Sequence, residues 1–227
     1  MGAIPVDPLV KWSWISANGG MIESALAQHA ELSALAIGIG LLLSVPLAVL
    51  AWHHRRFRAP LLGVTGLLYT VPSVALFALI QPLTGYFSVT TAEVALVSYT
   101  LLILVRNTLA GLDAVPAEVR EASVAMGYST PARILRVDLP LALPAIFAGL
   151  RVATVTTVGL VTVTAFIGEG GLGQLIINGF EQNGFHTEIV TGLVLSIALA
   201  AVGDLLVVGL ERATVRWSRV SAGRSGG

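Results

Sequence analysis

Residues Leu32–Trp52 read LSALAIGIGLLLSVPLAVLAW, a stretch without a single charged side chain. A helix needs about 20 apolar residues to cross the hydrocarbon core of a bilayer. The stretch follows Glu31 and ends in the basic cluster HHRRFR at residues 53–58. Of all 227 residues, 55% are hydrophobic and 11% are charged, with a mean hydropathy of +0.84, whereas soluble domains carry about 25% charged residues. The sequence therefore predicts an all-α, polytopic transmembrane bundle.

Further apolar stretches predict four more spans. The 59–92 segment is uncharged but too long for one span, and it holds the helix-weakening pair Gln81-Pro82, so we expect an outer loop after residue 80. Pro46 and Pro72 fall inside expected spans, which membrane helices tolerate where neighbours satisfy the freed backbone groups. The five predicted spans are 32–52, 60–80, 91–109, 144–167 and 189–210.

Basic residues alternate between the predicted loops. Three arginines lie in the 53–58 turn and four in the 106–143 segment, whereas the 81–93 and 168–188 loops have none. Lys and Arg concentrate on the cytoplasmic side of membrane proteins, so we expect the N-terminus outside and the C-terminus in the cytoplasm. The first apolar run is expected to be an uncleaved anchor, because Lys11 is the only lysine or arginine before it. The tail adds Arg212, Arg216, Arg219 and Arg224.

The third and fourth spans are joined by the loop DAVPAEVREASVAMGYSTPARILRVDLPLALP, residues 113–144. We expect a short helix over 117–126, because Pro116 favours a helix start and Glu118 suits the positive end of the helix dipole. Gly127 suits the left-handed residue that ends such a helix. A short capped helix in a cytosolic loop is suited to docking a partner, although a merely solvated loop is the alternative.

The remainder of this loop predicts a second short helix from about Thr130 to Val137. The pair Leu139-Pro140 is then expected to break the chain before the fourth span.

This loop resembles the EAA loop of ABC importer permeases. The family pattern is Glu-Ala-Ala, three residues, Gly, nine residues, an aliphatic residue, one residue and Leu-Pro. Here Glu121-Ala122-Ser123, Gly127, Val137 and Leu139-Pro140 take these places, with Ser123 for the second Ala. The resemblance implies a type I importer fold with a five-span, methionine-permease-like core. It also implies contact with an ATPase through Glu118, Glu121, Ala122, Ser123, Gly127, Leu139 and Pro140.

Three other segments resemble the glycine betaine/carnitine/choline class of these permeases: LYTVPS at 68–73, RNT at 106–108 and AGLR at 148–151. The segment IGEGGLG at 167–173 resembles a loop shared with methionine permeases, except that Glu169 replaces a small residue. The resemblance covers about 28–210, which implies a permease domain between a 1–27 external lead-in and a 211–227 cytoplasmic tail. The ends, 1–20 and 218–227, are expected to be loosely ordered.

The resemblance implies import of an osmoprotectant (glycine betaine, choline, carnitine or proline) across a bacterial cytoplasmic membrane. Methionine or another small solute is the alternative substrate. A non-transport scaffold or a channel is a third possibility, which the docking helix disfavours. The implied partners are a cytosolic ABC ATPase, a second permease subunit of the same or a homologous sequence, an extracytoplasmic binding protein and the lipid bilayer, with no nucleic acid.

The sequence predicts no catalytic or metal-binding residue. Its single lysine, Lys11, is not in a phosphate-binding loop of the Gly-x-x-x-x-Gly-Lys-Ser/Thr type, so ATP and Mg²⁺ are expected on the partner ATPase. His53 and His54 lie beside three arginines at the expected membrane surface, where a solvated role is more common than metal binding.

Two charged residues fall inside predicted spans, where they are costly and therefore candidates for a functional site. They are Arg151 and Asp204, which we group with Pro72 and Arg106 as candidate pathway or gate residues. The alternative is that Arg151 extends toward the surface while Asp204 pairs with it or with a tail arginine.

The external loop is rich in glycine. Gly168, Gly170, Gly171 and Gly173 surround Glu169. A tight turn is the simpler explanation, and a flexible rim that touches the binding protein is the alternative.

Overall fold

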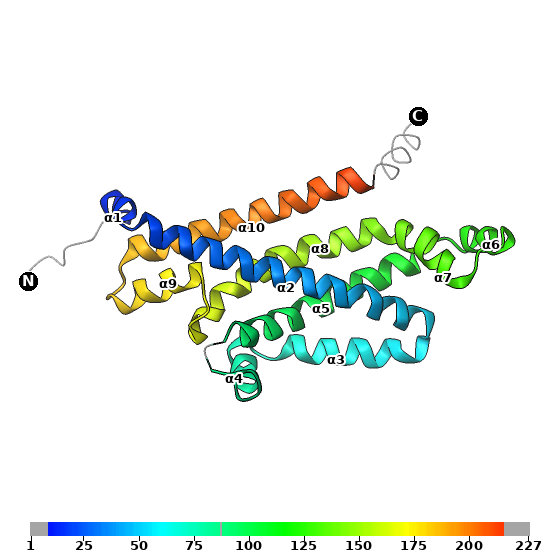
Figure 1. Ribbon diagram of the computed structural model, residues 1–227, viewed down its shortest axis with the longest axis horizontal. Helices are drawn as coiled ribbons and strands as arrows, with labels where there is room; N and C mark the ends of the chain where they lie inside the picture. Colours follow the sequence, from blue (N-terminus) through cyan, green and yellow to red (C-terminus); the bar gives the residue numbers. More distant parts are fainter. Residues whose placement is uncertain (1–8, 87, 216–227) are drawn as a thin grey trace, which may run out of the picture. The chain divides into compact units, whose positions relative to one another are not determined.

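The computed structural model describes residues 9–86 and 88–215, and every regular element in these ranges is a helix (Figure 1). Two elements are 3₁₀ turns (η1 and η3) and one is a π-helical turn (η2). In chain order the elements are α1 (Trp12–Ala17), α2 (Gly19–His53), η1 (Arg55–Phe57), α3 (Arg58–Thr70), α4 (Ser73–Thr84), α5 (Val89–Asp113), α6 (Ala117–Ala125), α7 (Thr130–Arg133), η2 (Ile134–Asp138), α8 (Leu139–Val161), η3 (Thr162–Ile167), α9 (Leu172–Glu181) and α10 (His186–Thr214).

The helices confirm the polytopic all-α prediction. Four helical stretches in the described ranges are long and apolar enough to cross a bilayer, and a fifth is present if α3 and α4 count as one interrupted span. Only 11% of the most apolar window of α10 is buried, so this helix presents its apolar surface outward, as a lipid-embedded protein requires. The four stretches are Gly19–His53, Val89–Asp113, Thr130–Ile167 and His186–Thr214.

The second span differs from the prediction of an unbroken helix over 60–80. Helix α3 ends at Thr70 and α4 begins at Ser73. Pro72 has an extended ψ of 133° and occupies the N-cap of α4. Proline lacks an N–H and disfavours the helical conformation of the residue before it, which explains the interruption. By contrast, Pro46 lies within α2 as expected.

The predicted break at Leu139-Pro140 is wrong. Helix α8 begins at Leu139 directly after the π-helical turn η2, so the helix continues through Pro140 without a break. The wider i to i+5 bonding of η2 comes directly before the proline, which has no N–H to donate. The fourth span therefore starts before residue 144, which was its expected beginning. The expected second loop helix is present as α7 followed by η2, and η2 leads directly into α8.

The N-terminal lead-in is more regular than expected from residue 12 onward. Residues 12–17 form α1 and α2 begins at Gly19, and α1 is held by an edge-on contact between the Trp14 and Phe185 rings, whose centroids lie 5.5 Å apart. The backbone N–H of Lys11 also donates to Thr187 Oγ1 at 2.9 Å. The 168–188 loop contains α9, which the sequence reading missed. Of the ends expected to be loosely ordered, 1–20 and 218–227, residues 1–8 and 218–227 lie outside the described residues, as do the tail residues Arg216, Arg219 and Arg224.

The chain divides into two compact units. Unit 1 takes its described residues from 9–36, 71–86, 88–97 and 155–202, and unit 2 takes them from 37–70, 98–154 and 203–215. Unit 2 has a core of small and aliphatic side chains, including Leu104, Leu150, Ala153 and Val207. Its helices approach closely at Gly149, where an added Cβ would lie 2.5 Å from the Asn107 Cβ. Every cluster discussed below lies within one unit.

Candidate coupling site and intramembrane charges

Helix α6 begins and ends as the sequence predicted. Pro116 caps its start with a ψ of 141°, and Gly127 follows its end with a φ of +83°. The Tyr128 N–H donates to the Ser123 carbonyl at 3.1 Å, and the Gly127 N–H donates to the Val124 carbonyl at 2.9 Å. These two bonds form a Schellman motif, which satisfies carbonyls at the end of the helix and requires a left-handed residue. Glycine therefore fixes where α6 stops.

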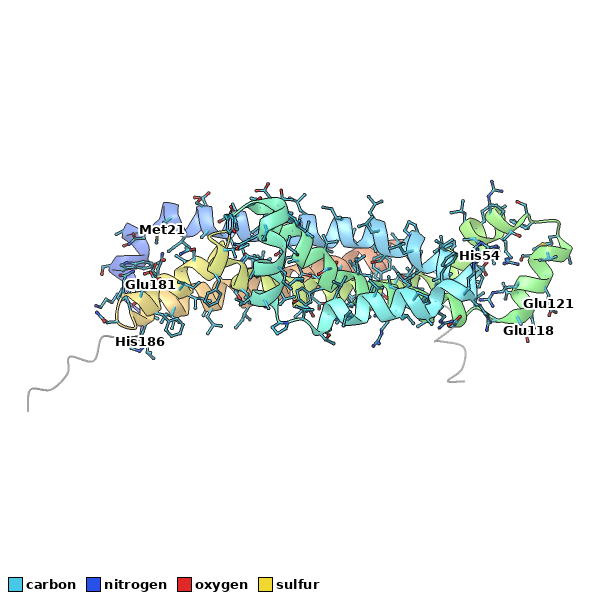
Figure 2. All side chains as sticks on the ribbon, turned by 90° about the horizontal axis from the view of Figure 1, so that it is seen from below. Met21, His54, Glu118, Glu121, Glu181 and His186 are labelled. Carbon is cyan, nitrogen blue, oxygen red and sulfur yellow. The ribbon has the colours of Figure 1, made fainter. Side chains whose placement is uncertain are left out.

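One face of α6 is available to a partner. Glu118, Glu121, Ala122 and Gly127 are exposed, and Figure 2 shows the two glutamates at the outside of the loop. Ser123 is instead buried, and its hydroxyl donates to the Arg120 carbonyl at 2.7 Å. The serine that replaces the family's alanine thus faces inward with its hydroxyl satisfied.

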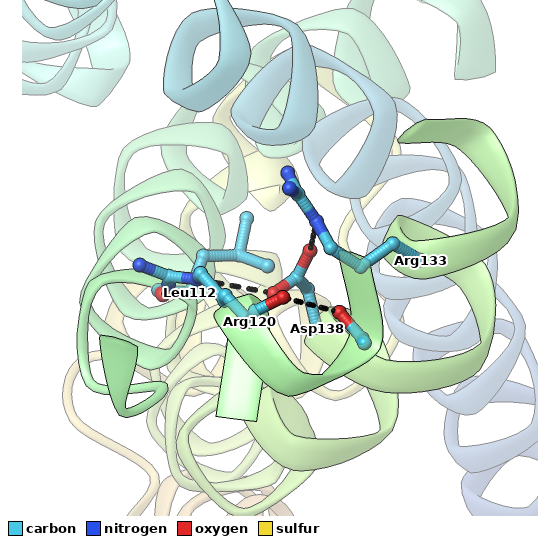
Figure 3. A network of polar contacts seen from close by, with 5 residues as sticks. Leu112, Arg120, Arg133 and Asp138 are labelled. Carbon is cyan, nitrogen blue, oxygen red and sulfur yellow. Dashed lines mark hydrogen bonds and ion pairs between the residues drawn. The ribbon is translucent and has the colours of Figure 1, made fainter. Parts of the chain in front are cut away.

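Beneath this face, a carboxylate is buried between two arginines (Figure 3). Asp138, whose side chain is 0% exposed, accepts from Arg120 Nε at 3.2 Å and from Arg133 Nε at 3.1 Å. The Arg120 Nη2 also donates to the Leu112 carbonyl near the end of α5. Its guanidinium carbon lies 4.8 Å from the centroid of the Trp52 ring, near the end of α2. We call Arg120, Arg133 and Asp138 the arginine clamp.

The sequence reading missed the arginine clamp because it depends on the type of helix. Arg133 and Asp138 are five residues apart, whereas neighbours on an α-helical face are three or four apart. The π-helical turn η2 has i to i+5 hydrogen bonds and therefore brings residues at this spacing together. Asp138 also occupies the unspecified position between Val137 and Leu139 of the family pattern, so the motif did not mark it as a candidate.

Leu139 and Pro140 lie directly after the arginine clamp. Leu139 packs against the buried cluster of Leu112, Ala142 and Ile146, which joins the ends of α5 and α8. These two motif positions are therefore structural neighbours of the loop rather than part of its exposed face.

The two intramembrane charges pair with each other. Arg151 Nε donates to Asp204 Oδ1 at 2.7 Å, and Arg151 Nη2 donates to Asp204 Oδ2 at 3.0 Å. The side chains are 46% and 24% exposed. Helices α8 and α10 touch beside them, because a Cβ on Gly203 would lie 2.8 Å from Thr154 Cγ2. Of the arrangements that the sequence left open, this intramembrane pair is the one observed.

Arg106, the other gate candidate in unit 2, does not join this pair. Arg106 is exposed on α5 and belongs to neither arginine–aspartate cluster. Pro72 belongs to unit 1, whereas Arg106 and the intramembrane pair belong to unit 2.

The glycine-rich loop of unit 1 is a closely packed turn. Gly168 and Gly171 have φ values of +77° and +45°. A Cβ on Gly171 would lie 2.8 Å from the His29 Cβ, and one on Gly173 would lie 2.2 Å from the Thr162 carbonyl oxygen. These close approaches explain the glycines without requiring a flexible rim.

Side chains of α2 hold this turn in place. The Gln28 amide donates to Glu169 Oε2 at 3.1 Å and accepts from the Gly171 N–H at 3.2 Å. The ring of His29, which is fully buried, lies with Nε2 2.9 Å from the Val158 carbonyl. This carbonyl lies four residues before Thr162, where α8 gives way to a 3₁₀ turn and ordinary i to i+4 bonding ends. Glu169 is thus a bonded part of the turn.

Long apolar helices, charges confined mainly to loops and a folded, polar loop helix define a multi-span helical membrane protein. The sequence profile of the family described as "binding-protein-dependent transport system inner membrane component" matches residues 36–216. The chain belongs to this family, and it is the membrane component of a transporter rather than a catalytic subunit. A binding protein and an ATPase are the partners that such a component implies.

Two relatives and one solved structure are similar over most of the chain. The osmoprotectant import permease protein OsmW of Salmonella typhimurium strain LT2 is 39% identical over 198 residues, which are 86% of this chain and 92% of OsmW. The choline transport system permease protein OpuBD of Bacillus subtilis is 33% identical over 202 residues, 88% of each chain. A structure of the MetNI methionine ABC transporter in an inward-facing conformation matches with a TM-score of 0.76 and 21% identity, covering 86% of this chain and 96% of that one.

The structural match confirms the expected type I importer fold, and at 21% identity it carries the fold alone. Together with the family, it sets aside the scaffold and channel alternatives. The family and the apolar helices agree on a multi-pass inner-membrane protein.

Proposed function

We propose that this chain is the membrane-spanning permease subunit of an ATP-driven importer of osmoprotectants, with glycine betaine, choline, carnitine or proline as the substrate class. The observation that carries the proposal is the 39% identity to an osmoprotectant import permease across 92% of that protein. The choline permease, at 33% identity, supports the same class. Methionine is less supported, because its transporter shares the fold at only 21% identity.

The substrate class can be tested by uptake in cells. Deleting the gene should slow the uptake of radiolabelled glycine betaine or choline in salt-stressed cells, and the gene supplied in trans should restore it. Methionine uptake in the same cells should not change. A loss of methionine uptake with unchanged osmolyte uptake would overturn the assignment.

Two copies of the permease, or this chain with a homologous one, would form the membrane pathway together with two cytosolic ATPase subunits that bind ATP and Mg²⁺. The extracytoplasmic binding protein would deliver the solute to the outer face. The alternation of arginines supports an external N-terminus and a cytoplasmic C-terminus, with the 113–143 loop in the cytoplasm. The glycine-rich loop would then lie outside, where Glu169 and its neighbours would meet the binding protein.

Helix α6 would dock in a groove of the ATPase and transmit its movements to the spans. The exposure of Glu121 and Ala122 and the fixed end at Gly127 support this role. Gly127→Val should abolish uptake, because a β-branched residue strains the left-handed conformation by about 1 kcal/mol or more. Ala122→Trp should do the same by holding α6 away from its groove, since close packing tolerates little added volume.

The matched control is Gly63→Val, at a helical glycine of α3 with open space around it. It should leave uptake unchanged. All three variants should insert into the membrane and retain capture of the loaded binding protein. Normal uptake in both loop variants would mean that α6 is not the transmission element.

Within the spans, the intramembrane pair is the best candidate for a gate contact, with Pro72 and Arg106 as further candidates. A bidentate contact between α8 and α10 can hold one arrangement of these helices and can be released by a competing charge. The break at Pro72 gives the second span a point at which it can bend.

A further inference from the structure

The arginine clamp lies where the loop meets the spans of unit 2. Its three members come from α6, α7 and η2, and η2 leads without interruption into α8. Arg120 extends the cluster to two further helices through the Leu112 carbonyl of α5 and the Trp52 ring of α2. One arginine of the docking helix therefore touches the loop-side ends of the first, third and fourth spans.

Because Asp138 is buried, moving one member of the clamp without the others costs free energy. A buried carboxylate is tolerated only when it is paired and hydrogen-bonded, and both Asp138 oxygens meet this condition through different arginines. If Arg120 or Arg133 moved alone, it would leave a charge under-satisfied at a site with 0% exposure. The low-cost movement is therefore one in which α6, α7 and the start of α8 move together.

We infer that the arginine clamp is the joint that carries a displacement of α6 to α2, α5 and α8, and that Asp138 is its positioning residue. This inference rests on the proposed docking of α6 to the ATPase. It adds that docking of α6 is not sufficient for transport. The contact between α6 and the ATPase can be intact while the displacement of α6 is not carried to the spans. Loss of the clamp should therefore separate ATP hydrolysis from transport.

The test uses the complete transporter in proteoliposomes with its binding protein and radiolabelled glycine betaine. Asp138→Asn keeps the shape of the side chain and removes its charge. It should raise the ATP hydrolysed per solute imported by about fivefold or more, the lower end of typical coupling between sites. Arg136→Gln is the matched control, because Arg136 is exposed on the same π-helical turn and outside the clamp. It should leave the ratio at the wild-type value.

A second measurement reports the joint directly. The chain has no cysteine, so Met126→Cys and Ala148→Cys provide two unique thiols for spin labels, at exposed positions beyond α6 and on α8. The distance between them should have a narrow distribution in the wild type and in Arg136→Gln, and a broad one in Asp138→Asn. If Asp138→Asn does not assemble, Arg133→Gln removes one partner, and Asp138→Glu should restore part of the coupling because it keeps the charge.

The outcomes separate the two proposals. An unchanged ATP ratio and an unchanged distance distribution in an assembled Asp138→Asn or Arg133→Gln transporter would overturn the clamp. Failure of wild-type α6 to cross-link to the ATPase would instead overturn the proposed docking, whatever the clamp variants do.

Discussion

Two of the arginine–aspartate clusters in unit 2 share their chemistry but differ in burial, in the number of partners and in the elements that they link. In the arginine clamp, one fully buried carboxylate accepts from two arginines, each through its Nε. In the intramembrane pair, one carboxylate accepts two bonds from a single arginine, and the side chains are 46% and 24% exposed. The clamp links short loop helices, whereas the pair links two spans.

The comparison shows how burial and the number of partners determine whether a charge contact is fixed or releasable. Breaking a buried contact leaves an uncompensated charge, so the clamp favours a single arrangement. The intramembrane pair is accessible, and a charged group that replaces one member can keep the other satisfied. This difference supports the proposed roles, in which the clamp transmits the displacement of α6 and the pair forms a contact that opens and closes.

The largest expected effect is that of removing the buried carboxylate. Asp138→Ala leaves two arginines without their shared acceptor and should destabilise the protein by about 3–5 kcal/mol, as is typical when one partner of a buried ion pair is lost. Asp204→Ala should destabilise it less, because the partly exposed Arg151 can extend its guanidinium toward the membrane surface. Thermal unfolding of the purified permease measures both. An equal loss in the two variants would remove the distinction between fixed and releasable contacts.

Reversing the charges of each cluster should have an effect of intermediate size on uptake, and it should differ between the two clusters. The double variant Arg151→Asp with Asp204→Arg restores a one-to-one pair and should recover much of the uptake lost in either single variant. Arg133→Asp with Asp138→Arg should not recover it, because the new arginine would face Arg120 inside a buried site. Recovery of uptake by the clamp reversal would show that Asp138 does not need two arginines.

The smallest effect is expected for the exposed pair Arg58 and Asp113, which serves as the reference for a surface ion pair. Arg58 Nη2 lies 2.6 Å from Asp113 Oδ2, and the side chains are 36% and 40% exposed. Exposed pairs of this kind contribute about 0–1 kcal/mol, so Arg58→Gln should hardly change thermal unfolding or uptake. A loss as large as that of Asp138→Ala would mean that exposure does not rank these contacts.

Features set by local chemistry could be predicted from the sequence. The first span follows from an uncharged stretch, and α6 with its left-handed end follows from Pro116 and Gly127. Pro140 was misjudged because proline usually interrupts a helix, whereas here the helix continues through it directly after a π-helical turn that the sequence did not reveal. Pro72 was expected to lie inside a continuous span, but it separates α3 from α4. Pro46 does lie inside a helix, so the presence of proline alone does not show which of the two positions interrupts its span.

Contacts that depend on helix register could not be predicted. Arg133 and Asp138 meet only because η2 is π-helical, and nothing in their spacing signals that turn. The intramembrane pair could be listed as an alternative because each charge is isolated in its span, but a tail arginine was an equal candidate for Asp204. The glycines of the 168–173 turn were recognisable, whereas their tight contact with α2 at Gln28 and His29 was not.

The most direct test of these roles measures ATP hydrolysis and glycine betaine uptake together in proteoliposomes for Asp138→Asn and Asp204→Asn. The first variant should hydrolyse ATP with little transport, so that the ATP hydrolysed per solute rises by about fivefold or more. The second should lower hydrolysis and uptake in proportion, because it alters the pathway but leaves the joint intact. If both variants gave the wild-type ratio, or if Asp204→Asn alone raised it, the assignment of transmission to the clamp would be contradicted.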